Sequence, residues 1–196
     1  MEWSILFAGP VGAGKTQAIR TISDIEVVGT EAAATDETAQ LKESTTVAMD
    51  MGMLHLEGGD KVRLYGAPGQ TRFDFMWDIL LEQARGLVLL IDHSRPDPVA
   101  DLGFYLKQLC ARMGDRQIPV VVGVTHVDLG ASRDLSLYRD NLLQLSAGAV
   151  GGAFPVLEMD ARSPHDVKTL LLALTSMLDM SERFPSRAGT GRGAHG

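Results

Sequence analysis

A glycine-rich stretch of eight residues near the N-terminus constrains the fold more than any other feature of the sequence. It reads Gly9-Pro10-Val11-Gly12-Ala13-Gly14-Lys15-Thr16 and fits the pattern GxxxxGKT. The apolar run 5–8 before it predicts a buried strand, and residues 17–22 after it have helical spacing. A strand, this loop and a helix in succession are the context in which the pattern forms a phosphate-binding P-loop.

The residue types of this loop fit the chemistry of a nucleotide phosphate chain. Glycines let successive backbone N–H groups turn toward the phosphates, and the N-terminus of the following helix adds partial positive charge. Lys15 can reach the β- and γ-phosphates, and the hydroxyl of Thr16 can ligate Mg²⁺. With Gln17, the next residue, these positions form the expected nucleotide-binding loop.

The rest of the chain predicts an α/β protein. Apolar strands are expected at 86–91, 118–124 and 154–159, separated by helices at 99–113, 135–146 and 163–180. Continuous apolar strands that alternate with helices indicate a parallel sheet covered on both faces. A helix is also expected at 72–84.

A predicted hairpin precedes this alternation. Residues 45–56 and 61–65 read as its strands, and 57–60 as its turn. The predicted fold is therefore that of a P-loop NTPase, with a mostly parallel six-stranded sheet, one antiparallel edge strand and helices on both faces. The domain is expected to cover residues 1–180, and the Gly- and Arg-rich residues 181–196 to form a disordered tail.

Composition excludes several classes of function. The formal net charge of −7 argues against nucleic-acid binding, which depends on phosphate neutralisation by Lys and Arg. The single cysteine, Cys110, fits a reducing compartment and reads as a small helix residue facing the core. No apolar run approaches the ~20 residues of a membrane span, and Glu2 excludes N-myristoylation. We expect a cytoplasmic protein without a direct membrane anchor.

Three further loops follow predicted parallel strands, where α/β sheets bind their ligands. They are residues 66–70, 125–128 and 160–162. In the second, Asp128 can accept hydrogen bonds from the N1–H and 2-amino group of guanine, which adenine cannot offer. His126 is expected to lie flat against the base, and Gln70 in the first loop to orient a water for in-line attack.

Together these motifs resemble those of Ras-like small GTPases over residues 1–180. Thr46 is similar to the switch I threonine, and Gly69-Gln70 to the switch II Gly-Gln pair. Thr125-His126-Val127-Asp128 is similar to the guanine motif Asn-Lys-x-Asp, and Asp160-Ala161-Arg162 to the Ser-Ala-Lys loop. Residues 64–70 and the Thr-His-x-Asp variant resemble a bacterial branch that includes the motility-polarity GTPases and, more distantly, the signal recognition particle receptor β subunit.

The resemblance implies GTP or GDP as ligand and Mg²⁺ held by Thr16 and Thr46. It also implies catalysis by Gln70, Lys15 and Thr46, and roadblock-type or GTPase-activating protein partners. The chain departs from the family at Gly66, where the family has a Walker B aspartate, and at Val11, beside the expected γ-phosphate position. Both departures imply weaker Mg²⁺ binding and slow hydrolysis.

The leading hypothesis is a guanine-nucleotide-dependent switch in a bacterial regulatory or polarity system, with slow, partner-stimulated GTP hydrolysis. We expect the partner to grip the apolar stretch 73–77, and Arg72 is the nearest internal cation. One alternative is a GTP-binding interaction module with negligible turnover, and another is a P-loop ATPase or kinase.

Overall fold

A computed structural model describes residues 2–29, 49–68, 74–114, 116, 118–130, 132–149 and 154–184. The described chain forms one seven-stranded sheet in the order β2-β3-β4-β1-β5-β6-β7. The strands are β1 (Glu2–Ala8), β2 (Val28–Gly29), β3 (Asp50–His55), β4 (Lys61–Gly66), β5 (Gly86–Asp92), β6 (Val120–Thr125) and β7 (Val156–Glu158).

The sheet is mostly parallel, as predicted. β4, β1, β5, β6 and β7 run parallel to one another, while β3 is antiparallel to β4. The two-residue strand β2 was not predicted, and it pairs antiparallel with the outer side of β3. The antiparallel strand is therefore second from the edge.

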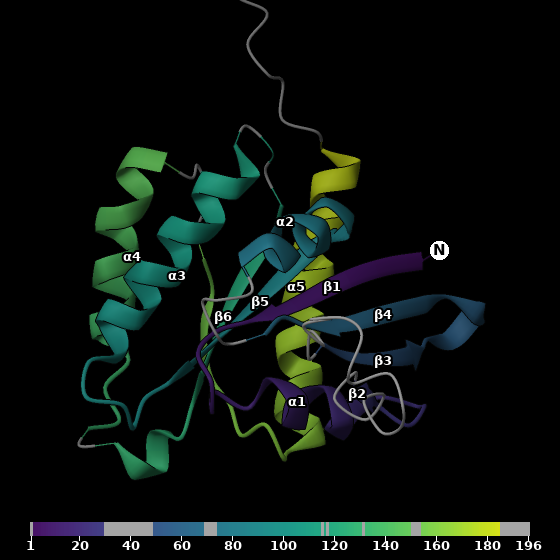
Figure 1. The fold of residues 1–196 in the computed structure, drawn as a ribbon, viewed down its shortest axis with the longest axis horizontal. Coiled ribbons are helices and arrows are strands. Elements are labelled where there is room, and N and C mark those ends of the chain that lie inside the picture. The colour runs from purple at the N-terminus through teal and green to yellow at the C-terminus, as the bar shows by residue number, and fades with distance from the viewer. Residues whose placement is uncertain are drawn as a thin grey trace, which may run out of the picture.

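In the described part of the chain, five α-helices cover the two faces of the sheet (Figure 1). They are α1 (Lys15–Ile22), α2 (Asp74–Gln83), α3 (Pro98–Met113), α4 (Ser136–Ala149) and α5 (Pro164–Arg183). The helices α1 and α5 pack on one face, and α2, α3 and α4 on the other. The prediction of an α/β fold with helices on both faces is confirmed.

The inner strand β5 explains why both faces of the sheet are covered by helices. Leu87, Leu89 and Ile91 belong to the apolar layer under α2 and α3, while Val88 and Leu90 belong to the layer under α1 and α5. All five side chains are fully buried. Because successive side chains of a strand point to opposite faces, a continuous apolar run fits only a strand buried on both sides.

The last helix begins where the sequence predicts and ends later. The Ser163 hydroxyl accepts a hydrogen bond of 3.3 Å from the N–H of Asp166, and Pro164 occupies the first turn. The helix continues to Arg183, three residues past the predicted end. Residues 185–196 of the predicted tail lie outside the described part. No described helix is long and apolar enough to cross a membrane.

Candidate functional site: a phosphate-binding loop beside a base-recognition loop

The P-loop leaves the carboxyl end of β1 with a backbone that only glycine fits. Gly9 has φ 134°, and a Cβ built on it would lie 2.0 Å from the carbonyl oxygen of Leu90 in β5. Gly14 has φ 89° and caps α1, and a Cβ there would lie 2.9 Å from the Cβ of Ala161. These contacts fix the loop against two neighbouring segments.

The side chain of Lys15 folds back on the P-loop, the segment expected to bind a phosphate. Its ammonium donates to the carbonyls of Gly9 at 2.8 Å and Pro10 at 2.7 Å, and the residue is only 8% exposed. Burial lowers the pKa of Lys15 to about 8, while the negative charge of Asp50 acts in the opposite direction. An ammonium carries three N–H groups, so one remains for an anion.

Thr16 lies beside a carboxylate that the sequence did not point to. Its hydroxyl donates a hydrogen bond to Oδ2 of Asp50, the first residue of β3. Asp50 pairs across the hairpin with Gly66, the last residue of β4. The carboxylate of Asp50 thus lies beside Gly66, the position at which the sequence lacks an aspartate.

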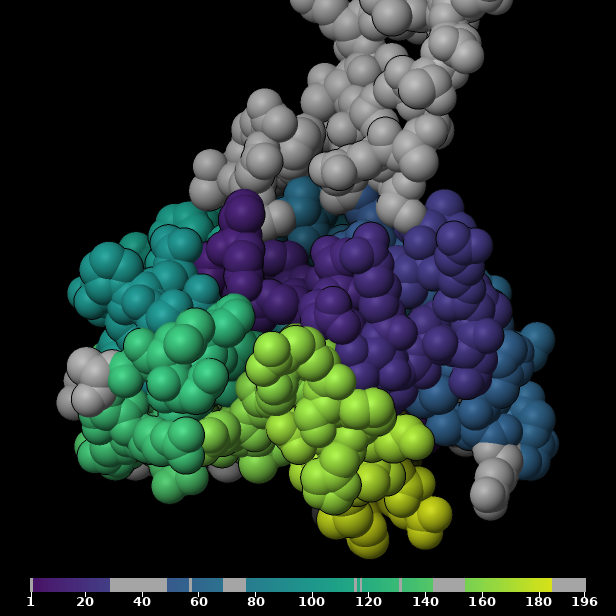
Figure 2. Space-filling view, turned by 90° about the horizontal axis from the view of Figure 1, so that it is seen from below, coloured from purple at the N-terminus to yellow at the C-terminus, as the bar shows by residue number. Residues whose placement is uncertain are grey.

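The P-loop and two of the three other predicted loops meet at one edge of the sheet. The Thr125 hydroxyl, at the end of β6, lies 3.2 Å from the Ala13 carbonyl. The Thr21 hydroxyl of α1 donates to the Ala161 carbonyl at 2.7 Å. In Figure 2 the purple P-loop region, the green segment after β6 and the lime start of α5 adjoin on one face.

The loop after β6 holds a histidine in an unusual conformation. His126 has φ 55°, which is left-handed, and precedes a short 3-10 turn over Val127–Leu129. Its Nδ1 lies 3.1 Å from Oδ1 of Asp92 and 3.2 Å from the Thr125 hydroxyl. Asp128 in the turn is exposed. The imidazole is therefore anchored at one edge, and the carboxylate of Asp128 is left open to solvent.

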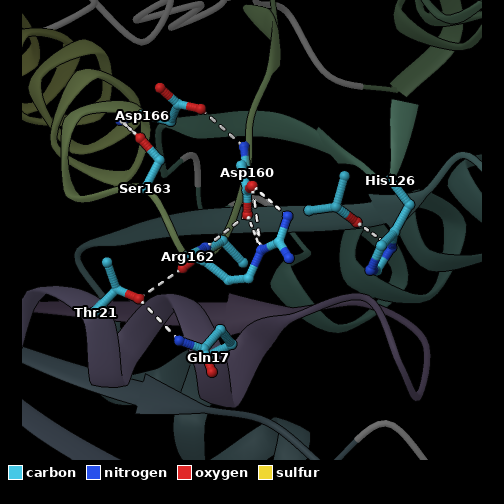
Figure 3. Close-up of polar contacts among 9 residues, drawn as sticks. Gln17, Thr21, His126, Asp160, Arg162, Ser163 and Asp166 are labelled. Atoms are coloured by element: carbon cyan, nitrogen blue, oxygen red, sulfur yellow. Dashed lines mark hydrogen bonds and ion pairs between the residues drawn. The ribbon is translucent and has the colours of Figure 1, made fainter. Parts of the chain in front are cut away.

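The third loop places a cation beside this carboxylate. The guanidinium of Arg162 binds both carboxylate oxygens of Asp160, at distances of 2.7 to 3.2 Å (Figure 3). These hydrogen bonds lower the pKa of Asp160 to about 2. The hydrogen bonds to Asp160 raise the pKa of Arg162, and the charge of Asp128 acts in the same direction. A planar ligand entering here would meet one carboxylate and one guanidinium.

A second histidine, which was not predicted from the sequence, supports the segment next to the base-recognition loop. His93 follows β5 and is buried, with Nε2 at 2.5 Å from the Ser132 carbonyl and Nδ1 at 2.6 Å from the Tyr138 hydroxyl. A carbonyl only accepts, so Nε2 carries the proton and Nδ1 accepts from the neutral Tyr138. Burial raises the pKa of Tyr138. The pair ties the segment after the 3-10 turn to α4.

Several predicted site residues either lie outside the described structure or have exposed side chains. Thr46, Gly69 and Gln70 lie outside the described residues, as does Arg72. Val11 is 58% exposed. The Gln17 side chain is also exposed, and it donates to the Thr21 hydroxyl at 3.1 Å.

We expected a protein partner to contact the apolar stretch 73–77, and this prediction is wrong for its last residue. Trp77 is only 5% exposed, and its ring packs on Tyr105 of α3 with ring centroids 5.8 Å apart. A large aromatic residue on the first turns of a helix that lies on the sheet is drawn into the core. Nearby, the apolar side chains that remain exposed include Ile79 and Phe104.

A separate apolar groove of about 540 Å³ lies between α5 and the β3–β4 hairpin. Its lining includes Trp3, Leu54, Leu56 and Leu171. It contains none of the P-loop or base-loop residues, so the candidate site is the open sheet edge and not this groove.

The donor set at the P-loop fits a magnesium ion. The described residues contain no group of three His, Cys, Asp or Glu side chains able to hold a metal. Magnesium bound with a nucleotide takes only one or two protein oxygens, because phosphates and waters supply the rest. The Thr16 hydroxyl and the Asp50 carboxylate, already in contact, are hard oxygen ligands of this kind.

The fold and this edge define a P-loop nucleotide-binding protein. The chain belongs to the family described as conserved hypothetical ATP binding protein, whose model matches residues 24–184. The match begins after the P-loop and α1. The P-loop is therefore evidence for nucleotide binding that does not depend on the family match. No curated protein matched the chain.

Proposed function

We propose that this protein is a guanine-nucleotide-dependent switch of the Ras-like type, which binds GTP or GDP with Mg²⁺ and hydrolyses GTP slowly. The observation that carries the proposal is that the two base-recognition loops lie against the P-loop and the helix that follows it. The Thr125 hydroxyl lies 3.2 Å from the carbonyl of Ala13 in the P-loop, and the Thr21 hydroxyl of α1 donates to the carbonyl of Ala161. A nucleotide with its phosphates on the P-loop then has its base beside Asp128 and Arg162.

The base preference rests on Asp128. Its carboxylate is exposed, and its charge acts on the neighbouring Arg162. Guanine offers it two donors, N1–H and the 2-amino group, whereas adenine has an acceptor at N1. The imidazole of His126, held by Asp92, provides a flat surface for the base.

Lys15 and Mg²⁺ supply the electrostatics of phosphate binding. Lys15 gives the fixed positive charge, and the ion neutralises the β- and γ-phosphate oxygens during transfer. Gln70 orients the attacking water, and Thr46 and Gly69 contact the γ-phosphate. These three roles rest on the resemblance, since the residues lie outside the described part.

We further propose that hydrolysis is stimulated by a regulatory protein partner of the roadblock or GTPase-activating type, in a bacterial regulatory or polarity system. The motility-polarity resemblance of residues 64–70 supports this assignment. Turnover separates this switch from an interaction module that binds GTP without hydrolysing it.

The second candidate is an adenine-nucleotide-binding protein, because the family description names ATP. Competition between nucleotides decides between the two. The full chain is loaded with a fluorescent GDP analogue and titrated with GTP, GDP, ATP and ADP. We expect the guanine nucleotides to displace the probe at much lower concentrations.

Asp128→Ala sharpens this test. The variant should lose guanine affinity by about 10²-fold or more while adenine affinity changes little, because only guanine uses the carboxylate. Asp134→Ala, at an exposed aspartate after the same turn, is the matched control. Tighter binding of ATP by the unmodified chain, or equal losses for both bases in Asp128→Ala, would contradict the guanine assignment.

A further inference from the structure

The carboxylate of Asp50 occupies the place of a side chain that Gly66 lacks. Asp50 opens β3 and Gly66 ends β4, and the two residues are register partners in the antiparallel pair. A Cβ built on Gly66 would lie 3.1 Å from both Cβ and Oδ2 of Asp50. A carboxylate on residue 66 and the carboxylate of residue 50 would therefore compete for the same space.

The surroundings of this carboxylate suit a cation. Asp50 is half-buried, its Oδ2 accepts from the Thr16 hydroxyl, and its charge acts on the ammonium of Lys15. A partly buried carboxylate is costly unless it is paired. Thr16 and Lys15 are also the two residues that face a nucleotide's phosphates in the proposed function.

We infer that Asp50, on the antiparallel strand β3, provides the carboxylate that holds Mg²⁺ on the bound nucleotide in place of the absent residue-66 carboxylate. The inference rests on the proposed function only in that the P-loop binds a Mg²⁺–nucleotide complex. Asp50 and Thr16 hold the ion by its coordinated waters or directly, and the nucleotide phosphates complete the coordination. Mg²⁺ binding is then not weakened by Gly66.

The first test is Asp50→Asn in the full chain. The amide keeps the size of the side chain and an acceptor for Thr16, but loses the charge. The release rate of a fluorescent GDP analogue is followed as Mg²⁺ is titrated and again in EDTA. We expect the Mg²⁺ concentration that gives half-maximal slowing of release to rise about 10- to 100-fold. In EDTA the variant should release nucleotide no faster than the unmodified chain.

The matched control is Asp24→Asn. Asp24 is an exposed carboxylate that accepts from the backbone N–H of His55, at the opposite end of β3. It also lies near β3 without facing the P-loop, so its loss should leave the Mg²⁺ dependence unchanged. Thermal melting of each variant establishes that the fold is retained.

A relocation variant tests the exchange of positions directly. Asp50→Gly alone should lose the Mg²⁺ dependence, and Asp50→Gly combined with Gly66→Asp should recover part of it. Removal of the Asp50 side chain clears two of the three contacts that a Cβ at 66 would meet, and the third is the flexible tip of Ile19.

The outcomes separate this inference from the proposed function. An unchanged Mg²⁺ dependence in Asp50→Asn overturns the inference while nucleotide binding stands. Faster release in EDTA also overturns it, because Asp50 would then support the loop and not the ion. No binding of guanine or adenine nucleotide by the unmodified chain overturns the proposed function itself.

Discussion

Lys15 is the residue on which phosphate binding depends most directly. Lys15→Ala should abolish tight nucleotide binding, at a cost of about 2–5 kcal/mol, because buried phosphate oxygens lose their charged partner. Calorimetric titration measures the loss, and a melting curve checks the fold. The ammonium donates to two loop carbonyls, but its lowered pKa shows that burial penalises its charge. Because the removal of the charge relieves this penalty, the fold should survive the substitution. Unchanged affinity would remove Lys15 from the site.

Gly9 and Gly12 separate two kinds of glycine requirement. Both have positive φ, but a Cβ on Gly9 meets the backbone of Leu90 at 2.0 Å, while one on Gly12 meets nothing within 4 Å. Gly9→Ala should cost roughly 3 kcal/mol of unfolding free energy, whereas Gly12→Ala should cost only the about 1–2 kcal/mol of left-handed strain. Urea unfolding of both variants gives the comparison. Equal losses would mean that the loop moves freely away from β5.

Single residues can be predicted as site candidates where their motif is local. Lys15, Thr16 and Asp128 are such candidates, because the sequence around each of them has a fixed spacing. The position of Asp50 beside Thr16 was not predicted, because it depends on which residue of β4 Asp50 faces. A four-residue turn over 57–60 would pair Asp50 with Ala67, but Leu56 also belongs to the turn, as its N–H donates to the Asp60 carbonyl at 2.8 Å. One residue of register decides the face on which a side chain lies.

At the scale of elements, the C-terminus of α2 is held by an arginine from a distant loop. Arg116 donates to the carbonyls of Leu81, Glu82 and Ala84, at 2.5 to 2.9 Å. The three carbonyls lie at or just after the C-terminus of the helix, where carbonyl groups lack the usual intrahelical partners and a cation is favoured. The contact fixes the end of the helix that follows the predicted switch segment 66–70.

Arg116→Ala should therefore loosen α2 specifically. We expect a loss of about 1 kcal/mol of unfolding free energy, since the arginine is solvent-exposed and its bonds are partly replaced by water. Amide hydrogen exchange should accelerate at residues 80–84 and stay unchanged in α3. The exposed Arg133, replaced by Ala, is the control. Equal acceleration in both variants would contradict a capping role.

The elements themselves were largely predictable. Apolar runs of β-branched residues and leucine identified β1, β5 and β6, and Ser163-Pro164 identified the start of α5. The strand β2 was not predicted, because two residues are too few to show an alternation of apolar and polar side chains. It is defined only by its pairing with β3. Trp77 was misplaced for a similar reason, since its burial depends on Tyr105 and not on its own neighbours.

At the scale of the whole molecule, the proposed switch predicts slow hydrolysis in isolation. The described structure places no arginine at the P-loop, and an added arginine contributes roughly 10³–10⁵ in rate to this chemistry. Single-turnover GTP hydrolysis should thus be slow alone and faster with the cognate partner. Gln70→Leu should abolish the stimulated rate and leave nucleotide binding intact.

The metal proposal makes this prediction more specific. If Asp50 holds Mg²⁺, the ion is not the limiting factor, and hydrolysis is slow because positive charge is missing at the γ-phosphate. Raising the Mg²⁺ concentration well above saturation should then not accelerate hydrolysis. Fast turnover by the isolated chain, or full stimulated activity in Gln70→Leu, would show that the mechanism is wrong.

The contact between Asp50 and Gly66 also has an evolutionary consequence. Because the two positions share one space, their residues cannot be chosen independently. Related chains with an acidic residue at the end of β4 should carry a small residue at the start of β3, and the reverse. Such paired exchange would make the two positions covary although 15 residues separate them, whereas each position alone would look poorly conserved. The functional constraint in this family would then lie in the pair and not in either residue.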